Sequence, residues 1–295
     1  MAGNITKIKR QLRSIKSTKK LTNAMLLVAT AKLQKERSRL FANNSYAGVF
    51  ESLLFKALCA KFDGEETNKF LTKSNVNNPL HIVFTSNSGL CGSYNLELLK
   101  FVEKNIGKDE PIFAIGTYGI RWLMNHDYMV VKQIDELNDF HPATINKLIS
   151  NIMKLYQEDE ISSIDIFYTD YVNTLNYEPR IYPLLPIIYD RSVMDETDLL
   201  LEPSRDELLN ELIPKYISSQ IYEKFLESKI SENAARRLAM DGANQNADSL
   251  ISSLEIKYNQ ARQSAITQEM NEITAGSLRW GMIWQNMKMK MLAKL

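Results

Sequence analysis

The chain has 295 residues, 44% of them hydrophobic, and its 36 basic residues nearly balance 35 acidic ones. This length allows one large domain or two modest ones, and a net charge of +1 indicates neither a nucleic acid partner nor an acidic substrate. Two cysteines exclude a disulfide framework and a cysteine-rich metal site, and they fit a reducing compartment. We expect no signal peptide and no transmembrane segment, because no run approaches the roughly 20 apolar residues of a membrane span.

The first predicted element is a long coiled-coil helix over residues 1–60. Neither Gly nor Pro occurs between Gly3 and Gly48, so nothing interrupts it. The first acidic residue is Glu36, and a basic, acid-free start is also typical of a mitochondrial presequence. A helix of the folded protein is favoured because a heptad pattern runs through the basic segment and beyond it; its apolar positions include Ile5, Ile8, Leu12, Ile15, Leu26, Ala29, Leu33 and Leu40.

The middle of the chain predicts a different architecture. After a polar linker at residues 61–79, short runs rich in β-branched and aromatic residues alternate with helix-compatible stretches. The predicted strands are 80–86, 111–117, 128–134 and 164–173, and the predicted helices are 93–106, 118–125 and 143–158. This alternation predicts a Rossmann-like α/β domain with a mostly parallel sheet over residues 80–190. A second linker is predicted at residues 191–203.

A second coiled-coil helix is predicted over residues 204–276. Ser204 and Glu207 form a capping-box start, and Pro214 is expected to kink or delay the helix. Its heptad positions are apolar to Ala265 and become polar at Gln268. Because neither long helix can bury its apolar stripe alone, we expect the two to pack antiparallel.

The last segment, Ser277–Leu295, predicts a basic amphipathic helix. It has four basic residues and no acidic one. Large apolar residues recur at helical spacing; these are Trp280, Ile283, Trp284, Met287, Met291 and Leu295. The segment either continues the preceding helix or folds back at Gly281.

No segment predicts catalysis. The loop Ser86–Asn95 (SNSGLCGSYN) could bind phosphate at a helix N-terminus or form a tight turn, and the turn is favoured because the chain lacks both the dinucleotide fingerprint and the GxxxxGK[ST] loop. The three histidines lack metal-ligand spacing, and Cys91 is expected to be a small buried residue. We therefore predict no catalytic residue, no cofactor and no metal site.

Several motifs resemble the gamma subunit of F-type ATP synthases. They are the N-terminal MAGNITKIKRQLRSIKSTKKLTNAMLLVATAKL, SGLCGSYN, LLP, AARRLAM and YNQARQSAITQEMNEITAG, in the family's order. The resemblance covers Met1 to Gly276. It implies a non-catalytic central rotor that transmits torque between an alpha/beta ring, which binds and hydrolyses ATP, and a membrane rotor, in proton-coupled ATP synthesis or hydrolysis.

The resemblance also implies partners. These are the alpha and beta subunits, the epsilon subunit and the membrane c-ring, with no nucleic acid and a possible extra partner for Ser277–Leu295. The location implied is the cytoplasmic face of a bacterial membrane, as a peripheral subunit. By position, the ring contacts are Met25, Arg236, Arg262, Gln263, Thr267, Gln268 and Glu269; the alternative for each is a solvated or intra-coil residue.

The chain departs from the family in places. Asn87 and Ser88 replace an acid and a base, and three leucines replace an aromatic-rich stretch before Glu202 and Pro203. These changes leave the coupling to protons open, but not the assignment as a rotor. Two alternatives stand beside the leading interpretation. One is the shaft of a paralogous ATPase that drives mechanical output, such as motility, without proton translocation. The other is a nucleotide-binding α/β enzyme with a coiled-coil arm.

Overall fold

The computed structural model describes residues 2–60, 68–72, 76–134, 142–173, 176–189, 202 and 204–292. These residues form two compact units. One combines the N-terminal residues up to Met25 with the C-terminal residues from Met240, and the other is Leu26–Ala239. Most of the predicted linkers at 61–79 and 191–203 lie outside the described residues, so the predicted segment boundaries stay a prediction.

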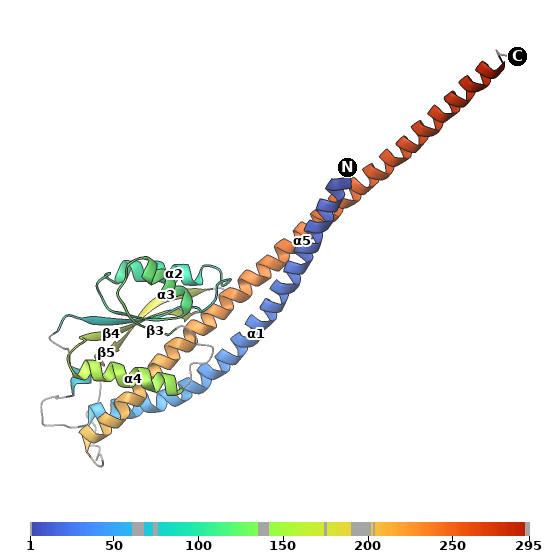
Figure 1. The fold of residues 1–295 in the computed structure, drawn as a ribbon. Helices are drawn as coiled ribbons and strands as arrows, with labels where there is room; N and C mark the ends of the chain where they lie inside the picture. Colours follow the sequence, from blue (N-terminus) through green and yellow to red (C-terminus); the bar gives the residue numbers. More distant parts are fainter. Residues whose placement is uncertain are drawn as a thin grey trace. The chain divides into compact units, whose positions relative to one another are not determined.

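Both predicted long helices are present. Helix α1 spans Ala2–Cys59 and α5 spans Arg205–Leu292 (Figure 1). Every predicted heptad position of α1 from Ile5 to Leu40 is buried or half-buried, as are those of α5 from Ala247 to Ala265. No described helix is long and apolar enough to cross a membrane.

The start of α5 follows the predicted cap. The hydroxyl of Ser204 accepts a hydrogen bond from the backbone N–H of Glu207 at 3.3 Å. The expected delay at Pro214 was wrong, because the helix begins at Arg205 and contains the proline. Leu212, Ile213 and Ile217 are almost fully buried on both sides of it, and this apolar burial outweighs the one backbone hydrogen bond that proline removes.

In the unit of residues 1–25 and 240–295, α1 and α5 run antiparallel, as predicted. Lys16 pairs with Glu255 at 2.7 Å, and Lys19 pairs with Asp248. The hydroxyl of Thr22 hydrogen-bonds to the side chain of Asn244. Polar contacts between the helices therefore fix their register where the heptad positions are not apolar.

The unit Leu26–Ala239 contains a five-stranded sheet in the order β3-β2-β1-β4-β5. The strands are β1 (Pro79–Phe84), β2 (Ile112–Ile115), β3 (Val130–Ile134), β4 (Ser163–Tyr171) and β5 (Tyr177–Leu185). The first four are parallel, as predicted, and β5 joins β4 antiparallel. Strand β5 was not predicted from the sequence, since Pro179 and Pro183 interrupt its pattern and fit only an edge strand.

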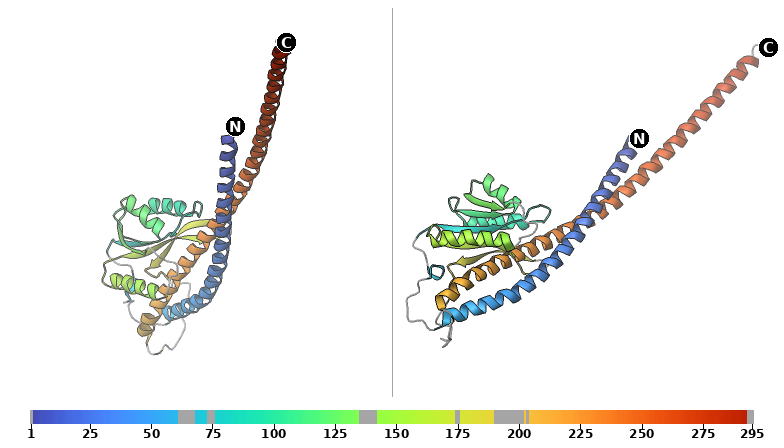
Figure 2. Two further views of the ribbon diagram at one scale, coloured as in Figure 1. Left: turned by 45° about the vertical axis from the view of Figure 1, so that its right-hand side comes forward. Right: turned by 60° about the horizontal axis from the view of Figure 1, so that its bottom comes forward.

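Helices cover both faces of this sheet (Figure 2). Helices α2 (Tyr94–Asn105) and α3 (Thr117–Asn125) pack on one face. On the other face lie α4 (Pro142–Gln157), the C-terminal part of α1 and the N-terminal part of α5, with a short 3-10 helix, η1 (Lys69–Leu71). Side chains alternate along β1: Ile82 and Phe84 belong to the core under α5, and Val83 to the core under α2. The predicted α/β fold is confirmed.

A charged cluster fixes α5 across β4 and β5. The Nζ atom of Lys224 lies 2.8 Å from Oε1 of Glu223 and 3.4 Å from Oε2 of Glu227. It also lies over the rings of Tyr168 and Tyr182, at 5.2 and 5.1 Å from their centroids. Burial raises the pKa of Glu227 to about 7, although Lys224 opposes the shift.

This pKa predicts a pH-dependent stability. The folded pKa of Glu227 lies above the ordinary 4.5, so the folded state holds the proton of this carboxyl more tightly than the unfolded state does. The contribution of Glu227 to the free energy of unfolding is therefore complete below pH 4.5 and is lost as pH rises through about 7. Relative to Glu227→Gln, the wild-type chain should lose up to about 3 kcal/mol of unfolding free energy between pH 4.5 and 8. Urea unfolding across this range measures the difference. The control Glu211→Gln, at an exposed position of α5, should follow the wild type, and parallel curves for wild type and Glu227→Gln would contradict the assignment.

Candidate functional site

The loop Ser86–Asn95 connects β1 to α2 and is held by its own side chains. The side-chain oxygen of Asn95 accepts a hydrogen bond from the backbone N–H of Ser86 at 3.1 Å. The Asn95 amide donates in return to Oγ of Ser86 at 2.7 Å. Leu90 and Gly92 have φ values of 62° and 59°, a left-handed conformation that glycine adopts without strain. The loop is therefore a tight turn with a buried internal brace.

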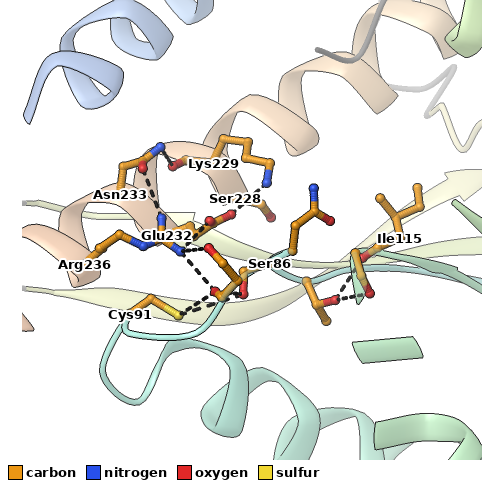
Figure 3. Close-up of polar contacts among 12 residues, drawn as sticks. Ser86, Cys91, Ile115, Ser228, Lys229, Glu232, Asn233 and Arg236 are labelled. Carbon is orange, nitrogen blue, oxygen red and sulfur yellow. Dashed lines mark hydrogen bonds and ion pairs between the residues drawn. The ribbon is translucent and has the colours of Figure 1, made fainter. Parts of the chain in front are cut away.

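Arg236 of α5 fastens this turn to the helix (Figure 3). Its Nη2 atom donates to the backbone oxygen and the hydroxyl of Ser88, at 3.1 and 3.2 Å, and to the backbone oxygen of Gly89 at 3.4 Å. Its Nη1 atom donates to Oδ1 of Asn233 at 3.2 Å. The planar guanidinium thus makes several contacts at once, which a lysine cannot reproduce.

Glu232 completes the cluster between two cations. Its carboxylate lies 2.7 Å from Nζ of Lys229 and 2.8 Å from Nη2 of Arg236. Burial by itself would raise the pKa of Glu232, but the two cations outweigh it and the pKa is lowered. Glu232 is therefore an anion in the folded chain. Lys229, Glu232, Arg236, Ser88 and Asn233 are called the Arg236 cluster below.

The same face of α5 also binds the sheet. The hydroxyl of Ser228 accepts a hydrogen bond from the backbone N–H of Thr169 on β4 at 3.1 Å. The hydroxyl of Ser231 donates to the backbone oxygen of Thr169 at 3.1 Å. Three buried polar residues of one helix thus hold both a strand and the adjoining turn.

Cys91 belongs to the same turn and lies beside the Arg236 cluster. Burial raises the pKa of the Cys91 thiol although Arg236 lies near it, so the thiol is a poor nucleophile. No group of three metal-binding side chains occurs among the described residues. The arrangement suits mechanical connection of α5 to the α/β fold.

Arg236 differs from the other predicted ring contacts in its burial and in its contacts. Arg236 is 8% exposed and its guanidinium contacts residues of its own chain. Met25 is half-buried on α1, while Arg262, Gln263 and Thr267–Glu269 are exposed on α5. These contacts with a ring stay predictions.

Two of the predicted ring contacts on α5 have described hydrogen bonds to residues four positions away on the same helix. The hydroxyl of Thr267 donates to the backbone oxygen of Gln263 at 3.0 Å, and the Gln268 amide donates to Glu272 at 2.9 Å. Gln263, Thr267 and Gln268 also line an open polar depression along the helix. Their polar groups are accessible to another molecule.

The Arg236 cluster was not predicted as a unit. Its segments SGLCGSYN and AARRLAM were identified only as separate motifs. The sequence feature that could have indicated the cluster is the helical spacing of Lys229, Glu232 and Arg236, which places one cation on each side of the anion. Nothing in the sequence indicated that the third partner is the turn after β1.

Removal of Arg236 should destabilise the chain. Arg236→Met leaves Glu232 buried beside one cation instead of two, and it leaves the Ser88 and Gly89 oxygens without this donor. We expect a loss of about 3–5 kcal/mol in unfolding free energy at pH 7. Arg237→Met, at the exposed neighbouring position, should change stability by less than about 0.5 kcal/mol. Equal effects of the two substitutions in urea unfolding would refute the role of the cluster.

Comparison with known proteins gives the family. The sequence profile of the family described as ATP synthase matches residues 4–278. The ATP synthase gamma chain of Mycoplasma mobile is 35% identical over 283 residues, covering 93% of this chain and 98% of the relative.

Two solved structures share the fold. The rotor of the Euglena gracilis mitochondrial ATP synthase has a TM-score of 0.63 at 17% identity, covering 90% of this chain and all of the other. The central stalk and c-ring structure from Tetrahymena thermophila has a TM-score of 0.57 at 22% identity, covering 76% and 99%. The chain belongs to the ATP synthase gamma chains, the non-catalytic central rotor stalks of F-type ATP synthases.

Proposed function

We propose that the chain transmits torque between an alpha/beta ring and a membrane c-ring at the cytoplasmic face of a bacterial membrane, in proton-coupled ATP synthesis or hydrolysis. The observation that carries this proposal is the C-terminal part of α5, where residues on all sides of one helix are exposed. A rotor inside a ring needs such a surface, since it meets each subunit in turn.

The predicted contact residues are distributed around the helix. Successive residues of an α-helix are rotated by about 100°, so Thr267, Gln268 and Glu269 point in three directions. Arg262 and Gln263 are likewise about 100° apart. One flat partner surface cannot reach all five, whereas a surrounding ring can.

The charge of α1 supports a ring with acidic surfaces. Its first acidic residue is Glu36, and Lys7, Lys9, Arg10 and Lys20 are exposed. Lys16 and Lys19 are paired with α5. A row of exposed cations gives a diffuse attraction that does not fix one position. We place Met25 at the beta subunit lever, beside this basic surface.

The Arg236 cluster supports transmission to the α/β fold. It joins α5 to the turn after β1, and Ser228 and Ser231 join α5 to β4. Rotation of this part of α5 therefore carries the sheet with it. We place the epsilon subunit and the c-ring at this α/β part of the chain.

Substitution of Arg262 and Gln263 tests the ring contact. The double variant Arg262→Ala/Gln263→Ala should lower ATP turnover of the assembled alpha–beta–gamma complex roughly tenfold, because a buried charge-assisted hydrogen bond contributes about 1.5–3 kcal/mol. The fold should be unchanged, since both side chains are exposed.

The matched control is Lys257→Ala/Gln260→Ala, an exposed basic and amide pair earlier on α5. It should retain turnover. Normal turnover and coupling in the Arg262/Gln263 variant would show that these residues only face solvent.

Subunit composition tests the coupling partner. The native complex, purified through a tag on this chain, should contain alpha, beta and epsilon subunits together with c subunits. A complex that contains the ring and hydrolyses ATP but lacks c subunits would instead indicate a shaft that drives mechanical output.

A further inference from the structure

The C-terminal part of α5 carries a second heptad pattern, separate from the one that packs on α1. Its positions alternate at steps of four and three and are Ile266, Met270, Ile273, Ser277, Trp280, Trp284, Met287 and Met291. We call this set the distal seam. It spans about four heptads, and all but one of its residues are large and apolar.

In the structure, the described part of α1 begins at Ala2 and does not lie along most of the distal seam. The contacts Thr22–Asn244, Lys19–Asp248 and Lys16–Glu255 set the antiparallel register. Continued to the start of α1, this register places Ala2 roughly opposite Gln268. Beyond that point α5 continues alone to Leu292 (Figure 1).

The exposure of α5 changes at the same place. Ala261 and Ala265 are half-buried, whereas every side chain described from Ile266 onward is exposed. The exposed fractions are 51% for Ile266, 60% for Met270, 69% for Ile273, 68% for Trp280 and 64% for Trp284. A row of large apolar side chains in water favours association.

We propose that two free copies of this chain pair through their distal seams as an antiparallel coiled coil. A heptad repeat selects a helix as the partner, and the seam is complementary to its own reverse. Antiparallel alignment places Met270 opposite Met287, Ile273 opposite Trp284 and Ser277 opposite Trp280, with each pair formed twice.

Residue size supports this alignment over the parallel one. The antiparallel pair sets the bulky Trp280 against the small Ser277, with Gly276 and Gly281 at flanking positions. A parallel pair would place each tryptophan against itself and leave facing serines. Alternation of large and small residues fills the space between helices more evenly.

The charged residues beside the seam also favour the antiparallel alignment. The antiparallel pair brings Glu269 of each copy near Lys290 of the other, which gives two opposite-charge contacts beside the seam. In a parallel pair Glu269 would face Thr274 of the other copy and position 290 would face position 295, so neither opposite-charge contact would form. Flanking charges of this kind set partner and direction in coiled coils.

Pairing and rotor assembly exclude each other. The distal seam begins within the residues proposed to enter the ring, and the family match ends at residue 278. The dimer therefore forms before the chain assembles with the ring. It covers the apolar surface that the ring covers after assembly. The pairing itself does not depend on the proposed function.

Sedimentation of the full-length chain tests the proposal. At micromolar concentration and low salt the chain should sediment as a dimer of the 33.9 kDa polypeptide. Ile273→Ser should weaken dimerisation at least about tenfold, because two apolar contacts are lost per dimer. The matched control Ile256→Ser removes an isoleucine that is 60% exposed but outside the seam, and it should dimerise as the wild type does.

Charge reversal tests the direction. Glu269→Lys and Lys290→Glu should each weaken the dimer about tenfold at low salt, since two attractive contacts become repulsive. The double variant Glu269→Lys/Lys290→Glu should restore it. A monomeric chain, a larger oligomer, or a dimer indifferent to Ile273→Ser would overturn the proposal, and failure of the double variant to restore dimerisation would overturn the antiparallel alignment.

Discussion

A long amphipathic helix must cover its apolar stripe, and this constraint governs both ends of the chain. Helix α5 is longer than α1, so one antiparallel partner cannot cover all of it. Where α1 packs, the heptad positions of α5 are buried or half-buried, and where α1 ends they are exposed. The exposed end is the surface for the ring, and in the free chain it is the surface we assign to a second copy.

The buried polar contacts of α5 serve a different need. Apolar packing is not directional, whereas the guanidinium of Arg236 and the hydroxyls of Ser228 and Ser231 each bind a defined backbone group. These contacts fix the rotation of this part of α5 against the turn after β1 and against β4. A rotor stalk needs such a fixed connection, because slip between a helix and its fold would dissipate torque.

Much of this fold could be predicted from residue periodicity. The heptad pattern from Ile5 to Leu40 predicted helix α1, and the cap at Ser204 predicted the start of helix α5. Strand β5 could not be predicted because its prolines hide the alternation of side chains. The expected delay of α5 at Pro214 was wrong, because the burial of the residues beside Pro214 is a tertiary property. Arg236 shows the same limit: its motif was visible, but its contact with Ser88 joins residues that are distant in sequence.

Rotation of the α/β part driven by ATP is the most direct test of the rotor assignment. The ring of alpha and beta subunits would be immobilised, and a bead would be attached through Met124→Cys, an exposed position on α3. The account predicts that the bead turns in one direction while ATP is hydrolysed and stops when ATP is removed. Sustained hydrolysis with a stationary bead would contradict it.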